Sequence, residues 1–231
     1  GTLLVSGAGS HVGVAGSFTV GQKFSTDPVA AAHGSGDVTV TGGASLGSVR
    51  LRVGNGTVTA SAGGQLSSSL GTVGDAVGQV GSLTITGPTS AWTITGPIAP
   101  GDSRNYFLVG RSGTGTLDVI GGGQLVVDSG PNLGPAGVIG RFAGSVGTIN
   151  VSGVGSRIEI KGLSDTTVAD PLSPGRTMGS GLNVGDQGQG TLNVTAGGKV
   201  SMSATNVGTG LPENGVTIGR CPGGSGTALV S

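Results

Sequence analysis

The chain has few charged and few aromatic side chains, and this scarcity excludes several classes of protein. Basic and acidic residues number 11 each, and aromatic residues make up only 3% of the 231 residues. No basic stripe with interleaved aromatic residues occurs, so we expect no nucleic-acid partner. No run of about 18 apolar residues is present, so we expect no membrane insertion of this segment.

Cysteine and histidine are scarcer still. Cys221 has no partner for an internal disulfide or a CxxC zinc site, and His11 and His33 have no acid or cysteine at ligand spacing. No serine nucleophile elbow and no phosphate-binding loop before a helix is present. We therefore predict no catalytic residue, no metal site, no cofactor and no enzymatic activity.

Glycine, in contrast, is abundant. The 52 glycines follow no G-X-Y period and are accompanied by only 10 prolines, which excludes collagen. Valine, leucine and isoleucine recur in alternating positions, which indicates ordered strands. The composition predicts an all-β protein whose core is made of small and aliphatic side chains.

One motif recurs along the whole chain, at intervals of 20 to 43 residues. It begins at "GTLLVS" and ends at the similar "GTALVS", and its starts lie near residues 1, 36, 56, 81, 115, 147, 190 and 226. Because these starts leave no region without a repeat, we predict one continuous domain over 1–231. The matching ends predict a segment of something longer, by covalent extension or by stacking.

Each repeat predicts three short strands. The first places two apolar residues on one face, the second follows a glycine turn, and the third ends on Val-Gly or Ile-Gly. The inward first-strand pairs are Leu3/Val5, Val38/Val40, Val58/Ala60, Leu83/Ile85, Leu117/Val119, Ile149/Val151 and Leu192/Val194. The third strands end at Val20-Gly21, Val53-Gly54, Val73-Gly74, Val109-Gly110, Ile139-Gly140, Val184-Gly185 and Ile218-Gly219.

Three strands in a minimum of 20 residues match one rung of a triangular β-solenoid. Stacked rungs pair their backbone edges and share one narrow core. We therefore predict a single-stranded parallel β-helix of about seven three-strand rungs. A β-sandwich or propeller would use antiparallel hairpins, which the three-strand register does not favour.

The repeat resembles the autotransporter-type β-strand repeats of Gram-negative surface and secreted proteins. "GTINVSGVGSRIEI", "GSLTITGPTSAWTI" and "LNVGDQGQGTLNVTAGGKV" (182–200) carry the resemblance. The resemblance implies a right-handed β-helix located outside the cell or on the outer-membrane surface. It also implies adhesin, stalk or filament roles. The chain departs from the family in lacking a translocator barrel and a recognisable cap.

Acidic residues on a β-helix can carry polysaccharide chemistry, because some β-helices are lyases and hydrolases. Asp118 occupies an outward first-strand column with Leu4, Thr39, Thr59, Thr84, Asn150 and Asn193, and Glu159 lies between Arg157 and Lys161. The first pattern is typical of a solvated strand face and the second of a charged surface. A β-helical polysaccharide-active enzyme stays an alternative function.

Insertions between the second and third strands are the main source of length variation. They cover 96–106, 128–137, 162–181 and 204–215, and a further insertion covers 22–35. Insertions at one corner of a solenoid line up along one edge and can form a binding rim. Candidate interaction residues in these loops are Asp102, Arg104, Tyr106, Asp165, Asp170, Arg176 and Glu213.

The leading functional hypothesis is a structural or adhesive segment of a bacterial surface or extracellular fibre, with end-to-end self-association or continuation of the same chain as its contacts. A solenoid end leaves backbone groups unpaired, which favours addition of another rung. The alternative is a module that binds a surface glycan or receptor through the loop edge.

Overall fold

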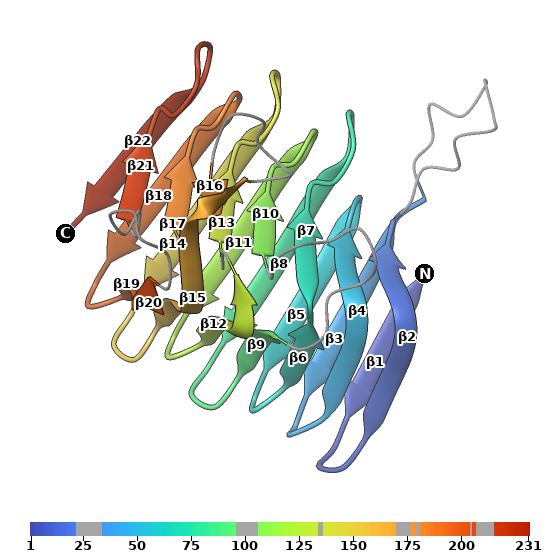
Figure 1. Cartoon of the computed structure of the whole chain (residues 1–231). Coiled ribbons are helices and arrows are strands. Elements are labelled where there is room, and N and C mark those ends of the chain that lie inside the picture. Colours follow the sequence, from blue (N-terminus) through green and yellow to red (C-terminus); the bar gives the residue numbers. More distant parts are fainter. Residues whose placement is uncertain are drawn as a thin grey trace.

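The computed structural model describes residues 1–21, 34–95, 106–133, 136–169, 177–178, 181–203, 205–206 and 215–231. These residues form strands and turns, and none of them belongs to a helix long and apolar enough to cross a bilayer. The strands stack as rungs from one end of the molecule to the other, with the two termini at opposite ends (Figure 1). The predicted parallel β-solenoid is confirmed; its handedness stays a prediction.

The first strands of the repeats form one parallel sheet. Its order follows the sequence: β1 (Thr2–Ser6), β3 (Gly36–Thr41), β5 (Gly56–Ser61), β8 (Val80–Thr86), β11 (Thr114–Ile120), β14 (Val146–Ser152), β18 (Gln189–Thr195) and β22 (Ser225–Val230). The glycines predicted to start the repeats lie opposite one another, from Gly36↔Gly56 through to Gly190↔Gly226. Every predicted repeat start is therefore in register.

The second and third strands form the other sheet. Second-strand positions belong to β2 (His11–Val20), β4 (Ser45–Val53), β6 (Gln65–Ser68), β9 (Ala91–Ile94), β12 (Gln124–Leu133), β15 (Arg157–Ala169) and β19 (Lys199–Met202). Third-strand positions belong to the later parts of β2 and β4 and to β7 (Leu70–Val73), β10 (Tyr106–Val109), β13 (Ala136–Ile139), β17 (Gly181–Val184) and β21 (Gly215–Ile218). The Val-Gly and Ile-Gly ends are paired in all seven described rungs.

The triangular rung needs a correction at its second corner. β2 and β4 each pass through both the second-strand and the third-strand position as one strand. Their pairing shifts register between Val14 and Ser17, so a bulge rather than a glycine turn redirects the chain. In the next rung, only Ser69 separates β6 from β7.

Two predicted insertions are partly strand. β12 continues to Leu133 and β15 continues to Ala169, where β15 pairs antiparallel with β16 (Thr177–Met178). Leu163 pairs with both Leu133 and Thr205, the latter in β20 (Thr205–Asn206). Parts of three successive insertions therefore stack on one another, as expected for insertions at one corner.

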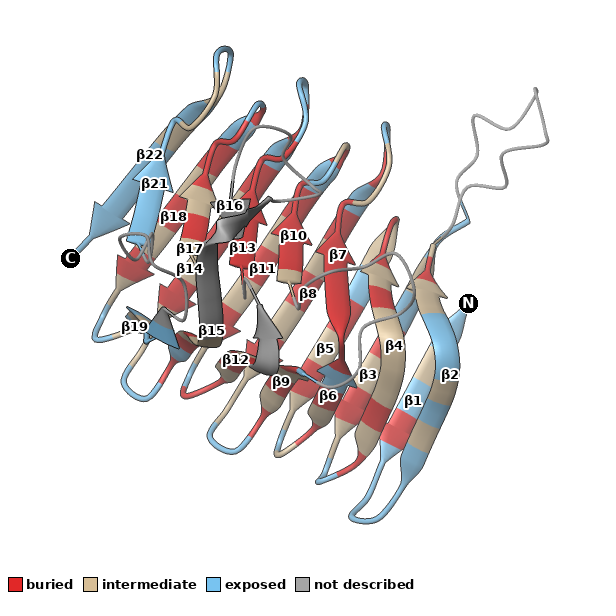
Figure 2. Cartoon of the chain, viewed as in Figure 1, coloured by how far each residue is buried: buried red, intermediate tan, exposed pale blue. Residues whose placement is uncertain are grey.

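The core is one continuous column of inward side chains. The predicted inward pairs of β3, β5, β8, β11, β14 and β18 are all buried, and opposite them lie Leu46, Leu66, Trp92, Leu125 and Ile158 from the second strands. Figure 2 shows buried residues throughout the middle rungs and exposed ones at both ends. Each rung thus has most of its apolar area covered by its neighbours, as in other repeat proteins.

Candidate binding groove and charged turn column

The turns after the third strands bring charged residues into a column that the sequence pattern did not reveal. In each turn the backbone N–H of the glycine donates to the last third-strand carbonyl of the preceding rung, as in Gly140 N to Val109 O at 2.9 Å. The next residue bonds to the preceding turn in the same way, as in Asp186 N to Gly140 O at 3.0 Å. This stacking aligns Asp75, Arg111, Arg141, Asp186 and Arg220.

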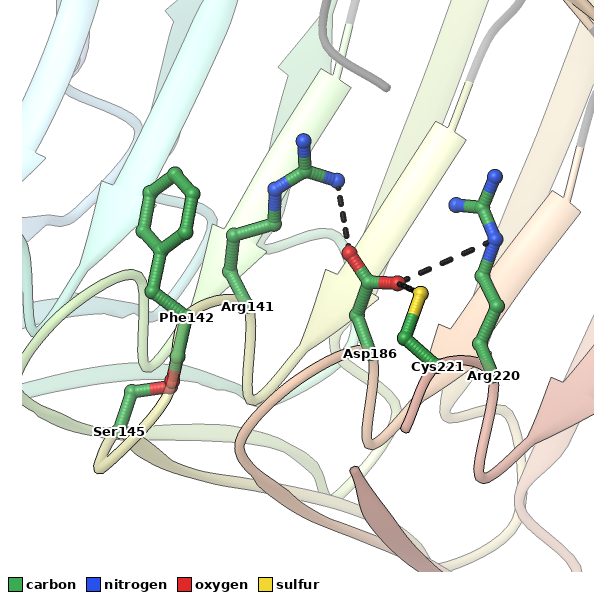
Figure 3. Close-up of polar contacts among 6 residues, drawn as sticks. All are labelled: Arg141, Phe142, Ser145, Asp186, Arg220 and Cys221. Atoms are coloured by element: carbon green, nitrogen blue, oxygen red, sulfur yellow. Dashed lines mark hydrogen bonds and ion pairs between the residues drawn. The ribbon is translucent and has the colours of Figure 1, made fainter. Parts of the chain in front are cut away.

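Asp186 is the centre of the buried part of this column (Figure 3). Its carboxylate accepts a hydrogen bond from Arg141 Nη1 at 2.9 Å and one from the Cys221 thiol at 3.2 Å, and it lies 3.9 Å from Arg220 Nε. The Arg141 and Asp186 side chains are only 7% and 3% exposed. Because the charges are paired and hydrogen-bonded, they are tolerated in a region that excludes water.

The exposed part of the column is held differently. Arg111 Nη1 lies 3.3 Å from Asp75 Oδ1, with side chains 44% and 18% exposed. The guanidinium groups of Arg111 and Arg141 lie 5.8 and 5.4 Å from the centre of the Phe142 ring. An aromatic ring attracts cations, so Phe142 allows two arginines to lie on adjacent rungs.

A groove of about 240 Å³ lies on the outer face of the third strands beside this column. Its floor is β7, which contributes Leu70, Gly71 and Thr72. β4 supplies one wall and β10 with its turn supplies the other; the remaining lining residues are Arg50, Leu51, Arg52, Asp75, Tyr106 and Arg111. Arg50 and Arg52 pair with Leu70 and Thr72, so the walls and floor are successive rungs.

Two features of the groove point to a ligand. Thr72 Oγ1 is buried and has no hydrogen-bond partner, which is unusual for a buried polar atom. Arginine supplies three of the four charged lining residues, and the one carboxylate, Asp75, is already paired with Arg111. The lining is therefore rich in arginine and contains a hydroxyl without a hydrogen-bond partner.

The structure places one predicted interaction residue in this groove: Tyr106, at the start of β10. Asp165 lies in β15 opposite Met178, but its side chain is outside the described part of the chain. Asp102, Arg104, Asp170, Arg176 and Glu213 also lie outside the described residues. Sequence reasoning missed Arg50, Arg52 and Thr72, whose signal is a polar residue at the outward third-strand position in neighbouring rungs.

The outward first-strand column behaves as predicted for a polar strand face. Asn193 donates to Asn150 at 2.9 Å and Asn150 donates to Asp118 at 2.7 Å across adjacent rungs. The predicted charged patch is confirmed as well, because Arg157 and Lys161 both lie within 4.0 Å of Glu159. Lys161 Nζ is also 3.6 Å from Asp128, so Asp128 and Glu159 are neighbours on a half-exposed strand face.

Among the described residues, no three His, Cys, Asp or Glu side chains lie close enough together to hold a metal ion. Comparisons with protein-family models, curated proteins and solved structures find no match. The resemblance to autotransporter-type repeats therefore stays an expectation drawn from the sequence motifs.

Proposed function

We propose that the chain is a structural or adhesive β-solenoid segment of a bacterial cell-surface or extracellular fibre, and that it has no catalytic role. The observation that carries this proposal is the unbroken register of the first strands: the same repeat positions pair from β1 to β22 along the described chain. Such an architecture gains its stability from neighbouring rungs and can extend by adding more of them. The outward face of the first strands presents mostly small polar side chains, as a solvated stalk requires.

The end rungs support a contact with a further rung. Val230 and Ile218 occupy columns whose members in the middle rungs are buried, yet they are 78% and 51% exposed. At the other end, Leu3 of β1 and Val12 of β2 are only partly buried, although the residues paired with them, Val38 and Leu46, are buried. Unpaired strand edges flanked by apolar side chains are templates for another strand. The partner we propose is another rung, supplied by the same chain or by a second copy.

Sedimentation velocity of the purified chain tests self-association at this end. We expect a concentration-dependent shift to larger species, and we expect Val230→Lys to reduce it because a charge would be buried at the junction. Val154→Lys is the control, since Val154 is 88% exposed in a turn away from the end rungs. A single monomeric species at every concentration, or equal behaviour of both variants, would count against stacking of copies.

A second candidate function is binding of a surface glycan or receptor, as the loop-edge hypothesis expects. The observation that favours it is the position of Tyr106 in the wall of the groove. A polysaccharide-active enzyme is a weaker alternative. The two carboxylates that would serve it, Asp128 and Glu159, are neighbours, but both contact Lys161 on an open strand face. Release of reducing ends from polysaccharides, lost in Asp128→Asn and Glu159→Gln variants, would establish that alternative.

A further inference from the structure

We propose that the groove over β7 binds an acidic sugar unit of a polysaccharide, that is, a ring carrying a carboxylate or a sulfate. This proposal rests on the second candidate function and specifies its ligand. The residues that carry it are Arg52, Thr72, Tyr106 and Arg111, all of which line the groove.

The charge of the lining selects an anion. Arg111 forms an ion pair with Asp75. Arg52, in contrast, has no side-chain hydrogen bond or ion pair within the described part of the chain. Arg50 and Arg52 lie two residues apart on the same face of β4, roughly 7 Å along the strand. Guanidinium groups bind carboxylates and sulfates through paired N–H donors, so Arg52 can hold one anionic group of a ligand.

The floor selects a ligand that also has hydroxyl groups. Thr72 Oγ1 is buried without a partner although buried polar atoms are nearly always hydrogen-bonded. Thr72 is in the column of Arg52 and Leu108, so its side chain projects from the outer face of β7 toward the groove. A sugar hydroxyl that donates to or accepts from Thr72 would satisfy this atom while the anionic group contacts Arg52.

The opposite wall and the volume select a sugar ring. Tyr106 and Leu70 occupy paired positions of β10 and β7 and give the groove an aromatic and an aliphatic surface. A sugar ring has an apolar face that packs on such surfaces, whereas an inorganic anion would use the arginines alone. The volume of about 240 Å³ is below that of sites for drug-sized ligands, so the groove suits one sugar unit.

Calorimetric titration of the whole chain tests the proposal with four probes: tetragalacturonate, a sulfated glucosamine disaccharide, neutral cellotetraose and inorganic sulfate. We expect at least one acidic saccharide to bind more tightly than cellotetraose and sulfate. We also expect its affinity to fall between about 50 mM and about 500 mM NaCl, because salt screens the charges. Arg52→Gln should weaken it about tenfold, since a charge-assisted hydrogen bond is lost.

Two further variants separate binding from folding. Thr72→Val should weaken binding severalfold yet leave the melting temperature equal or higher, because it removes an unsatisfied buried hydroxyl. Arg157→Gln removes a half-exposed arginine from another strand face and should leave affinity within about twofold of the parent, because a screened surface charge contributes little.

The outcomes distinguish the two levels of the proposal. If cellotetraose binds as well as the acidic saccharides, or if Arg52→Gln and Thr72→Val bind like the parent, the acidic-sugar site is wrong while glycan binding stands. If inorganic sulfate binds as tightly as the saccharides, the groove is a simple anion site and the proposal that it recognises a sugar ring is wrong. If none of the four probes binds, both the acidic-sugar site and glycan binding through this groove are overturned.

Discussion

At the scale of single residues, the core makes room for its largest side chains by having a glycine beside each of them on a neighbouring rung. A Cβ at Gly71 would overlap the ring of Trp92, and a Cβ at Gly137 would overlap the ring of Phe107. Trp92 is fully buried, and its indole Nε1 donates to Ser68 Oγ at 3.0 Å. The two glycines therefore replace the large apolar residue that other rungs carry at this third-strand position.

Gly71→Ala should lower the free energy of unfolding by about 1–3 kcal/mol, because an added methyl group has no room against a buried indole. Urea unfolding followed through the fluorescence of Trp92, the single tryptophan, measures the change. Gly16→Ala is the matched control, since a Cβ at Gly16 meets nothing within 4 Å and Gly16 also lies in a strand. Equal destabilisation by both variants would contradict this account of Gly71.

The inward residues could be predicted from the sequence because alternation along a strand is a local pattern. The third-strand positions at which a glycine replaces the large apolar residue could not be predicted in this way. Gly71 accommodates Trp92, which belongs to the next rung, and that contact depends on how rungs stack rather than on the sequence near either residue. The burial of the Thr72 hydroxyl could not be predicted either, since a threonine at an outward position is typical of a solvated face.

At the scale of elements, the turns after the third strands lock successive rungs together through charge. Arg141 and Asp186 come from adjacent turns and are almost fully buried, whereas Arg111 and Asp75 make the same kind of pair in a more exposed place. Removing one partner of a buried ion pair lowers the free energy of unfolding more than removing one partner of an exposed pair. The reason is that only the buried pair leaves an uncompensated charge away from water.

Asp186→Ala should therefore lower the free energy of unfolding by about 3–5 kcal/mol, since it removes the carboxylate shared by Arg141 and Arg220. Asp75→Ala should lower it by less than about 1 kcal/mol, because Arg111 can be solvated when its partner is lost. Urea unfolding of both variants under identical conditions gives the comparison. A loss at Asp75 as large as that at Asp186 would show that burial does not set the contribution of this column.

Element register was predictable because glycine turns and the Val-Gly or Ile-Gly ends repeat along the chain. The joining of second and third strands in β2 and β4 was not, since a bulge has no strong sequence signal. The outer faces of β7, β10 and β13 were missed as well: Leu70, Leu108 and Val138 are buried although they face away from the shared core. Their burial depends on what lies over this face, which periodicity cannot reveal.

At the scale of the whole molecule, the chain is one solenoid whose rungs depend on their neighbours and whose two end rungs have fewer of them. Figure 2 shows this directly, with β1 and β2 at one end and β21 and β22 at the other largely exposed. The fold could be predicted from the repeat, but the groove could not, because it combines residues from β4, β7 and β10 that are distant in sequence. Among the predicted interaction residues whose side chains the structure describes, Tyr106 is placed there.

The fibre proposal is tested most directly by cryo-electron microscopy of the purified chain. We predict rods in which the spacing of about 4.8 Å between rungs continues across the junction from one copy to the next. The strand edges of β21 and β22 would then be paired, and Val230 would be buried at that junction. Discrete particles of about seven rungs, with unjoined ends at every concentration examined, would contradict the end-to-end stacking on which a fibre of separate copies depends.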